Sequence, residues 1–338
     1  MNKAEWKNFK FNCFEKVWFW SRAPWVINLL NFPFAAFLSK FTKGKKYFIS
    51  LLKLRFLFKR KVVFGLLEYM VTTKCTLNCR HCNTQIPYFK NGAHTSITKF
   101  EDFKTDIDKV LAACDYVNIL GFVGGEPMLC ADLSKMIEYA LSKKKIKGVF
   151  LATNSTILPN EELLKVMKNK KFAVLTSDYS HVKNIENGVT VKYDEHKEIL
   201  SKAGVKFNNH HEKLGSNNWI SMPKVYKDKQ DAVFIQKQWR NCIQICNIII
   251  EGKLIPCTMS AFIWQNLDLT DGIKKEVVDV RNSKSSKELS NKLIEYFSVP
   301  NSEFCHYCHF ENIQTGLPCG EQISAEEAAL YIQNNKNL

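Results

Sequence analysis

Between residues 62 and 225 the sequence alternates between strand-like and helix-like segments, and this alternation restricts the fold more than any other feature. Apolar runs of strand length occupy residues 64–73, 116–125, 147–154 and 171–178. Helical patterns lie between them at residues 98–114, 132–145 and 160–170, and segments 194–204 and 205–211 continue the alternation. Because strand–helix–strand units with this spacing make right-handed crossovers, the sequence predicts an α/β fold with a parallel sheet.

Three of the helical patterns begin at residues that favour a helix N-terminus. Thr98 and Glu101 have the spacing of a capping box, in which each side chain bonds a backbone N–H at the start of the helix. Asp132 and Asn160 precede the next two helical patterns. We therefore expect these helices to start close to residues 98, 132 and 160.

The cysteines indicate metal ligation and not a disulfide framework. The chain has 338 residues, of which 46% are apolar, so it can bury one large core with an appendage or two modest domains. Nine of its twelve cysteines fall into two groups, at 75/79/82 and at 242/246/257/305/308/319. No signal-peptide cleavage site is visible, so we expect a reducing, cytoplasmic environment. The remaining three, Cys13, Cys114 and Cys130, are interpreted as ordinary thiols.

Residues 1–62 carry most of the net charge. They contain fourteen Lys/Arg and two Glu, which gives +12 of the total of +15. They are also rich in Trp and Phe, and their longest uncharged run, residues 23–39, is interrupted by two Pro and two Asn. This composition favours helices that lie in an anionic membrane interface on the inner face over a spanning helix. A helical cap on the rest of the protein is the alternative, and nucleic-acid binding is not expected because no RNA-binding module is recognisable.

Three cysteines, Cys75, Cys79 and Cys82, follow the first predicted strand with C-x3-C-x2-C spacing. In parallel α/β sheets the loops at the carboxyl ends of the strands carry the chemistry. Three thiolates can hold three irons of a [4Fe-4S] cluster and leave the fourth iron open, whereas structural zinc and ferredoxin clusters use four ligands. A zinc site completed by His81 or by a distant residue is the alternative. The flanking Lys74 and Arg80 could modulate such a cluster or simply be solvated.

Four motifs after successive strands together resemble the radical S-adenosylmethionine (radical SAM) superfamily. CTLNCRHC has that family's CxxxCxxC spacing, and GGEP at 124–127, ATNS at 152–155 and TSDYS at 176–180 follow the next three strands. Ser155 stands where the family usually has Gly. The resemblance implies a partial (β/α)6 TIM-type barrel over residues 63–225, in which a reduced cluster cleaves S-adenosylmethionine and the resulting 5′-deoxyadenosyl radical abstracts a hydrogen atom from the substrate. By the same resemblance Cys75, Cys79 and Cys82 bind the cluster, and the cofactor contacts are Gly124, Gly125, Glu126, Pro127, Thr153, Asn154 and Ser177.

Residues 226–338 resemble the auxiliary-cluster domains, called twitch or SPASM, of many radical SAM enzymes. A hairpin around Glu251–Gly252 and the CHYC motif at 305–308 suggest one further [4Fe-4S] cluster. The expected ligands are Cys246, Cys257, Cys305 and Cys308. Cys242 matches the longer SPASM spacing and could replace Cys246, and Cys319 could also substitute; a zinc ribbon is the alternative for the whole region.

Candidate catalytic residues lie in the loop after the fourth strand and among the remaining cysteines. Asp178 and Tyr179 are expected to contact cofactor or substrate, and Cys242 or Cys319 could donate a hydrogen atom if it is not a ligand. The polar run at 207–212, with Asn209, His210 and His211, could also reach the substrate.

The expected function is radical modification of a small-molecule or lipid-linked sugar, by dehydrogenation or epimerisation, in glycan biosynthesis. The expected partners are a flavodoxin- or ferredoxin-type electron donor and an anionic membrane surface. A peptide-modifying radical SAM enzyme is the first alternative. A non-catalytic protein stabilised by metal is an alternative of another class.

Overall fold

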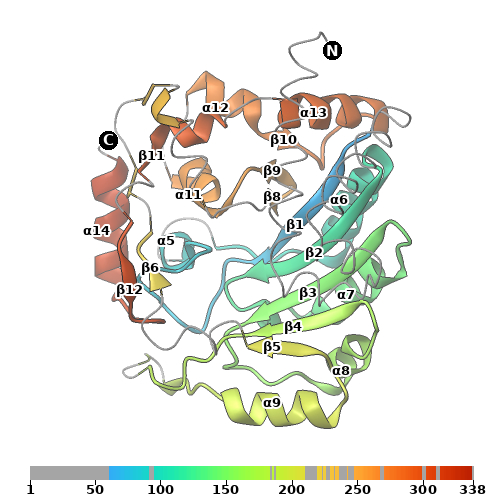
Figure 1. Cartoon of the computed structure of the whole chain (residues 1–338), viewed down its shortest axis with the longest axis vertical. Coiled ribbons are helices and arrows are strands. Elements are labelled where there is room, and N and C mark those ends of the chain that lie inside the picture. The colour runs from blue at the N-terminus through green and yellow to red at the C-terminus, as the bar shows by residue number, and fades with distance from the viewer. Residues whose placement is uncertain are drawn as a thin grey trace, which may run out of the picture.

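A computed structural model describes residues 61–90, 95–182, 185, 188–209, 219–222, 224–225, 229–231, 233–235, 242, 247–266, 270–298, 302–309 and 313–336. Its N-terminal part alternates strands and helices as the sequence predicts (Figure 1). The strands are β1 (Val63–Thr72), β2 (Tyr116–Gly124), β3 (Ile146–Thr153), β4 (Phe172–Thr176) and β5 (Phe207–Asn209). The helices are α5 (Ile86–Lys90), α6 (Phe100–Ala113), α7 (Leu133–Ser142), α8 (Glu161–Met167) and α9 (Tyr193–Lys202), with a 3-10 turn, η1, at Pro127–Leu129.

These five strands pair in parallel in the order β1-β2-β3-β4-β5, so the predicted parallel sheet is confirmed. Each crossover passes through a helix or a longer connection, which brings all the carboxyl ends of the strands to one edge of the sheet. The arrangement is a mixed α/β fold of the partial TIM-barrel type.

The C-terminal part extends the same sheet. Strand β8 (Asn247–Ile250) pairs in parallel with β1 and forms a hairpin with β9 (Lys253–Ile255), and β10 (Val278–Asp279) pairs with β9. Within the described chain the sheet order is therefore β10-β9-β8-β1-β2-β3-β4-β5. The hairpin expected at residues 251–252 is confirmed: Glu251 and Gly252 have φ of +50° and +75°, as a tight two-residue turn requires.

The remaining C-terminal elements are short strands and helices around this sheet. They are α11 (Thr258–Asn266), α12 (Asp271–Glu276), α13 (Ser286–Ser298), η3 (Glu303–Tyr307) and α14 (Ala325–Lys336). Strand β11 (Cys308–His309) pairs with β7 (Lys224–Val225), and β12 (Thr315–Leu317) pairs with β6 (Trp219–Ile220).

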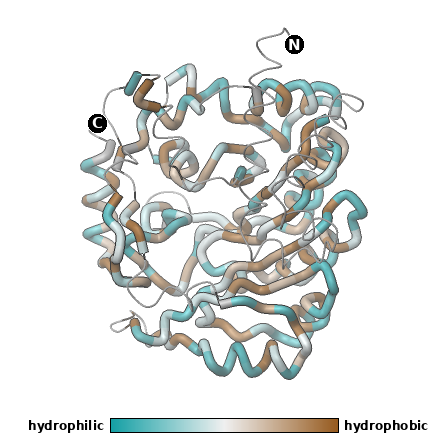
Figure 2. Tube along the Cα trace, in the orientation of Figure 1, coloured by the Kyte–Doolittle hydropathy of each residue, from teal (hydrophilic) through white to brown (hydrophobic). Residues whose placement is uncertain are grey.

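The sheet has an apolar core on both faces. On one face α6, α7, α8 and α13 contribute to the core cluster that contains Tyr69 and Val71 of β1. On the other face α5, α11 and α14 pack near Leu66 and Met70 of the same strand. Figure 2 shows hydrophobic residues on the central strands and hydrophilic residues on outlying helices such as α9. A strand buried on both faces needs a nearly continuous apolar run, which β1 has.

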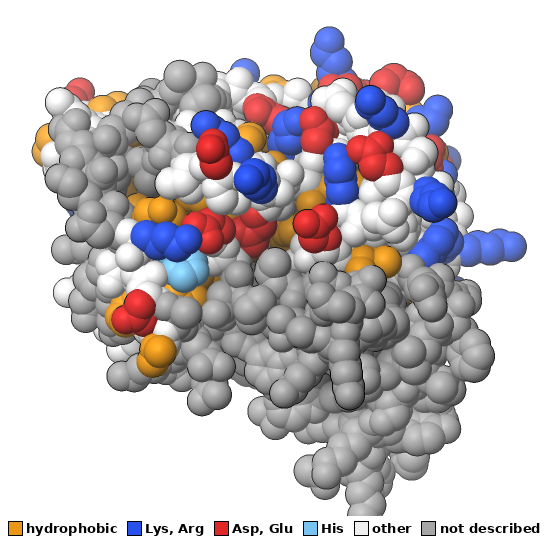
Figure 3. All heavy atoms as spheres, turned by 90° about the horizontal axis from the view of Figure 1, so that it is seen from above, with side chains coloured by type: hydrophobic (Ala, Val, Ile, Leu, Met, Phe, Trp, Pro, Cys, Tyr) orange, Lys and Arg blue, Asp and Glu red, His pale blue; other side chains and the backbone are white. Residues whose placement is uncertain are grey.

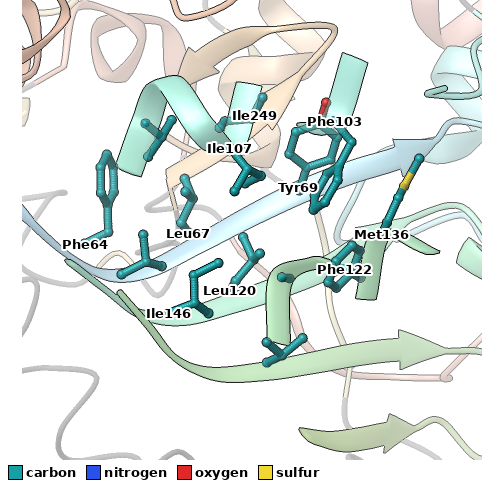
Figure 4. Packing of buried hydrophobic residues seen from close by; sticks show 14 of the residues in the cluster. Phe64, Leu67, Tyr69, Phe103, Ile107, Leu120, Phe122, Met136, Ile146 and Ile249 are labelled. Carbon is teal, nitrogen blue, oxygen red and sulfur yellow. The ribbon is translucent and has the colours of Figure 1, made fainter. Parts of the chain in front are cut away.

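Three aromatic rings pack together in the larger core (Figure 4). Phe103 of α6 packs edge-on against Tyr69 with ring centroids 4.9 Å apart and lies 5.4 Å from Phe122 of β2. The Tyr69 hydroxyl donates to buried Asp106 at 2.7 Å. Arg281, which follows β10, binds the same carboxylate through two nitrogens at 3.0 and 2.7 Å. This network joins the C-terminal region to the first strand and helix of the barrel.

The predicted helix starts are only partly correct. Asn160 caps α8 by accepting the Leu163 N–H, as expected. The capping box at Thr98 is wrong, because α6 starts at Phe100 and the Thr98 N–H donates to Val71 of β1. Asp132 precedes α7, but its side chain makes no capping hydrogen bond to that helix. Its carboxylate instead accepts the N–H of Phe100, the first residue of α6, at 3.2 Å.

The described surface carries charges of both signs. Figure 3 shows Lys and Arg interspersed with Asp and Glu on the face that carries α12 and α13, where Lys292 pairs with Glu288. The strongly basic segment 1–62 lies outside the described residues, apart from its last two positions. No helix in the described part of the chain is long and apolar enough to cross a membrane.

Candidate active site

Four loops follow β1, β2, β3 and β4 at the carboxyl edge of the sheet, and they contain the residues that the sequence singled out. The first loop carries Cys75, Cys79 and Cys82, and the second carries the Gly124–Pro127 turn. Thr153–Ser155 ends β3, and Ser177–Tyr179 follows β4. The parallel pairing of these strands brings the loops together.

The glycine turn packs directly on the cysteine loop. The Gly125 N–H donates to the Thr72 carbonyl at 2.8 Å, and the Glu126 N–H donates to the Lys74 carbonyl at 2.9 Å. A Cβ atom at Gly125 would lie 1.9 Å from the Lys74 oxygen and 2.9 Å from Cys75 Cβ. At Gly124, where φ is +149°, a Cβ would lie 2.3 Å from the Thr72 oxygen. Both positions therefore require glycine for steric reasons.

Glu126 braces the second and third loops from a fully buried position. Its carboxylate accepts the Asn154 N–H at 2.9 Å, the Met128 N–H at 3.1 Å and the Thr153 hydroxyl at 3.0 Å. Burial raises the pKa of Glu126 to about 7, although the three donors oppose the shift. The hydrogen-bond partners described for the Glu126 carboxylate are thus groups of the protein itself. Pro127 follows directly and starts the 3-10 turn η1.

Asn154 connects the third loop to the cysteine loop. Its side-chain amide donates to Cys75 Sγ at 3.5 Å and to the Thr76 hydroxyl at 3.0 Å. The next residue, Ser155, has φ of +61°, in the left-handed region. The radical SAM pattern usually has Gly at this position. A left-handed backbone explains that preference, because glycine adopts it without the strain that a side chain causes. The Ser155 hydroxyl is buried and has no hydrogen-bond partner among the described residues.

Each sulfur of the C-x3-C-x2-C motif faces a hydrogen-bonding group. Besides Asn154, the Leu77 N–H donates to Cys75 Sγ at 3.4 Å. The Gln322 amide donates to Cys79 Sγ at 3.3 Å, and the Thr84 hydroxyl lies 3.3 Å from Cys82 Sγ. Such groups stabilise thiolates that ligate an iron–sulfur cluster. The donor set and the glycine cradle beside it therefore fit a [4Fe-4S] cluster with a small ligand.

No three Cys, His, Asp or Glu side chains of the described chain converge as ligands of a single metal ion. A cluster does not need such convergence, because each thiolate binds a different iron. His81, considered above as a zinc ligand, accepts the Met222 N–H at 3.4 Å through Nδ1. Arg80 is paired with Glu321 and Glu327 at 2.9 and 2.8 Å.

The loop after β4 contributes a buried aromatic ring. Tyr179 packs edge-on against Trp219 with centroids 5.8 Å apart, and lies in an apolar cluster with Leu77, Cys79 and Cys319. Burial, with Cys79, Cys82 and Cys319 nearby, raises the pKa of Tyr179 well above its usual value. The Ser177 N–H donates to the Thr153 carbonyl at 3.0 Å.

Asp178 and Ser177 have different surroundings from Tyr179. The Asp178 carboxylate accepts the Ser180 N–H at 3.0 Å and its hydroxyl at 2.6 Å, so it is engaged in a local turn. Ser177 is half-buried at the end of β4. The predicted roles of both residues in cofactor or substrate contact remain predictions.

The structure brings Cys319 to the first site. Cys319 is 2% exposed and shares the apolar cluster with Cys79, and its carbonyl lies 3.0 Å from His181 Nε2. Shortly after it, residues 321–323 run beside residues 78–80. No pattern in the sequence indicated that this segment would reach the cysteine loop, because the two are about 240 residues apart.

The other C-terminal cysteines that the structure describes lie on other elements, and Cys257 and Cys308 pack on the same apolar cluster as Cys75 and Cys82. Cys257 precedes α11, where the Ser260 N–H donates to its sulfur at 3.4 Å. Cys305 lies in η3, which packs against α11, and Cys308 starts β11. Cys242 is half-buried. Cys246, His210 and His211 lie outside the described residues, and the structure places Asn209 at the end of β5.

The fold and this site define an α/β protein with a cysteine-rich site suited to an iron–sulfur cluster. Residues 69–208 match the family model of the radical SAM superfamily. These residues form a radical SAM domain, of the class that uses a [4Fe-4S] cluster and S-adenosylmethionine.

Curated relatives extend the similarity beyond the matched domain. Over 291 residues the chain is 29% identical to a protein named GTP 3′,8-cyclase from Clostridium botulinum strain Hall, covering 80% of this chain and 86% of that protein. A protein of the same name from strain Okra is 32% identical over 103 residues, 29% of this chain and 31% of that protein.

Solved structures are more distant. anSMEcpe with bound AdoMet is 16% identical, with 81% of this chain and 92% of that chain covered and a TM-score of 0.45. BtrN in complex with AdoMet and 2-DOIA is 15% identical, with 77% and 97% covered and a TM-score of 0.42. Likeness at this level does not indicate a shared substrate.

Proposed function

We propose that Cys75, Cys79 and Cys82 hold a [4Fe-4S] cluster that cleaves S-adenosylmethionine reductively, and that the enzyme uses this chemistry to remove a hydrogen atom from a sugar carbon of its substrate. The observation that carries the proposal is the hydrogen-bonding group facing each of the three sulfurs at 3.3 to 3.5 Å. When bound, the cluster and cofactor supply an electron and a 5′-deoxyadenosyl radical.

The protein's own residues position this chemistry. Gly124 and Gly125 bring the second loop against the cysteine loop with no side chain between them. Glu126 fixes the second loop to the third through Thr153 and Asn154. Because these contacts are buried, the loops form a preorganised cradle that excludes water from the reacting atoms.

A second cluster in the C-terminal part is part of the proposal. Cys257 lies at the N-terminus of α11, whose N–H groups and helix dipole favour a thiolate. Cys305 and Cys308 have the CxxC spacing of a cluster corner, and Cys308 packs on the same apolar cluster as Cys257. The fourth ligand is Cys246 or Cys242. This arrangement would suit a cluster that accepts an electron from the substrate radical.

The proposed substrate class is a sugar or glycan intermediate. Reaction at a sugar carbon is compatible with the curated relatives, whose name, GTP 3′,8-cyclase, specifies the 3′ position of a nucleotide, a ribose carbon. Their similarity over 80% of this chain also supports a second candidate, cyclisation of a purine nucleotide. Modification of a peptide, the alternative that the sequence also suggested, remains a further candidate.

The basic segment 1–62 supports a peripheral membrane site for this reaction. Its charge of +12 and its Trp and Phe content suit the interface of an anionic membrane on the cytoplasmic side. A sugar carried on a lipid would then reach the active site at the membrane surface. The proposed electron donor is a flavodoxin or ferredoxin.

The cluster proposal is tested by iron and sulfide analysis after anaerobic reconstitution. We expect about eight irons per chain, about four for each [4Fe-4S] cluster, in the wild type, and about four in a Cys75/Cys79/Cys82→Ala variant. With dithionite, 5′-deoxyadenosine should form only in the wild type. If the triple variant retains all of its iron, the three cysteines do not hold the cluster.

The substrate proposal is tested by deuterium transfer. Candidate sugars, sugar nucleotides and GTP, each deuterated on its sugar carbons, are incubated with the reduced enzyme and cofactor. Deuterium in 5′-deoxyadenosine identifies the compound whose hydrogen is removed. Transfer from a deuterated peptide and from none of the sugars would reject the sugar class.

The membrane proposal is tested by flotation of the full chain with vesicles. We expect the protein to float with anionic vesicles and not with neutral ones, and to be released as ionic strength rises. Absence from the anionic vesicle fraction at low salt would contradict an interfacial role for residues 1–62.

A further inference from the structure

Residues 319–327, here called the strap, bind along the middle of the cysteine motif. Cys79 and Gln322 form an antiparallel β-bridge. The Ile323 N–H donates to the Asn78 carbonyl at 2.9 Å, and the Arg80 N–H donates to the Glu321 carbonyl at 2.7 Å. The strap is therefore joined to the cysteine loop by backbone pairing on both sides of Cys79.

The side chain of Gln322 has one orientation that satisfies its neighbours. Its Oε1 accepts the Asn78 N–H at 2.7 Å, so the oxygen end of the amide is fixed. Its Nε2 then donates to the Gly320 carbonyl at 2.6 Å and to Cys79 Sγ at 3.3 Å. Because an amide nitrogen carries two hydrogens, both donations are made at once. The reversed amide would place an oxygen against a carbonyl and an N–H against an N–H.

Charged side chains hold the strap in this position. Arg80, in the cysteine motif, donates to Glu321 at 2.9 Å and to Glu327 at 2.8 Å. Asn78 Nδ2 donates to the Ile323 carbonyl at 2.5 Å. The donors to Cys75 and Cys82 described above belong to the barrel, whereas the donor to Cys79 comes from the C-terminal region.

We propose that Gln322 is a positioning residue that tunes the reductive step, by holding an N–H on the Cys79 sulfur and so stabilising the reduced cluster. The inference rests on the proposed function, because it requires Cys79 to be a cluster ligand. Adding an electron increases the negative charge on the cluster and its thiolates. A hydrogen-bond donor on a ligating sulfur lowers the energy of that state more than the energy of the oxidised state, and so raises the reduction potential.

The test is a redox titration of the cluster that responds to S-adenosylmethionine, followed by electron paramagnetic resonance in the reconstituted full-length protein. Gln322→Met keeps the length of the side chain but removes the donor. At a fixed solution potential, we expect its ratio of reduced to oxidised cluster to fall about tenfold, or about 59 mV for a one-electron couple. Gln322→Glu should shift further in the same direction, because it adds a negative charge.

Matched controls separate this effect from general damage. Gln265→Met makes the same substitution on α11, where Gln265 bonds Glu251 and not a motif sulfur, and should leave the potential unchanged. The proposed auxiliary cluster provides an internal reference that should titrate alike in all the proteins. The rate of 5′-deoxyadenosine formation should fall in the Gln322 variants in step with the reduced fraction.

Three outcomes would count against the proposal in different ways. Iron-loaded Gln322→Met and Gln322→Glu proteins that titrate at the wild-type midpoint would overturn the role of Gln322 and leave the proposed function intact. A wild-type protein that binds no cluster at Cys75, Cys79 and Cys82 would overturn the proposed function itself. Loss of iron from both variants, with the helical content retained, would replace the tuning role by a purely structural one.

Discussion

The carboxylate of Glu126 accepts the backbone N–H of Asn154 at 2.9 Å, and this buried bond ties the loop after β2 to the loop after β3. Glu126→Gln would place an amide N–H against the Met128 or Asn154 N–H, because both carboxylate oxygens face donors. We expect unfolding free energy at neutral pH to fall by about 1–3 kcal/mol. Urea denaturation of wild type and variant under anaerobic conditions measures it; equal stability would show that the loops are held by other contacts.

The same residue predicts a pH dependence of stability. Burial raises the pKa of Glu126 from 4.5 to about 7 in the folded state. Below pH 4.5 the group is protonated in both states; between pH 4.5 and 7 it ionises only in the unfolded chain, so its stabilising contribution is lost as pH rises. The loss amounts to about 3 kcal/mol. The wild type should therefore lose more stability than Glu126→Gln between pH 4.5 and 7, and parallel curves would contradict the raised pKa.

Gly125→Ala tests the contact between the glycine turn and the cysteine loop. Its Cβ would lie 1.9 Å from the Lys74 carbonyl oxygen, so one of the loops must move. We expect the affinity for S-adenosylmethionine to fall at least about tenfold, since a displaced loop forfeits the preorganised cradle. Calorimetric titration of the reconstituted protein measures it. Gly204→Ala, at a glycine with φ of +69° and no atom within 4 Å of its Cβ, should bind the cofactor like the wild type.

Ser155→Gly is expected to stabilise the protein. Ser155 has φ of +61° and a buried hydroxyl without a described partner, so the substitution relieves backbone strain and removes an unsatisfied group. The expected gain is about 1–2 kcal/mol in unfolding free energy. Ser155→Ala keeps the strain and removes only the hydroxyl, so its gain should be smaller. A less stable glycine variant would mean that the hydroxyl has a partner in the native protein.

Arg281→Met should strongly destabilise the junction between the C-terminal region and the barrel. The substitution leaves the carboxylate of Asp106, which is 0% exposed, without its cation. The expected loss is about 3–5 kcal/mol, whereas Tyr69→Phe, which removes one hydrogen bond to the same carboxylate, should cost about 1 kcal/mol. Lys292→Met, which breaks the surface pair with Glu288, should cost far less than either of these substitutions, because solvent screens that pair. Comparable losses for Arg281→Met and Lys292→Met would rule out a structural role for the buried network.

The sequence predicted the strands and the order of the site loops well, because these depend on local patterns. The run at 64–73 corresponds to β1, and the motifs at 75–82, 124–127 and 153–155 follow successive parallel strands. Helix caps were less predictable. Thr98 is paired with β1 and not with the start of α6, since a tertiary contact competes with the local cap.

Contacts between distant segments could not be read from the chain. Nothing in the sequence indicated that β8 would pair with β1, that Arg281 would bind Asp106, or that Gln322 would reach Cys79. Each of these depends on where the C-terminal region packs on the barrel, which is decided by the burial of apolar surface on both faces of the sheet and not by any local propensity.

The sequence by itself determined the chemistry of the first site, because three cysteines at fixed spacing can sit on one short loop whatever the rest of the chain does. The tertiary structure decided which groups face their sulfurs. Asn154 reaches Cys75 from a neighbouring strand, and Gln322 reaches Cys79 from the far end of the chain. A hydrogen bond requires its two atoms to lie within about 3.5 Å, and for residues so far apart in sequence only the folded sheet and strap bring them that close.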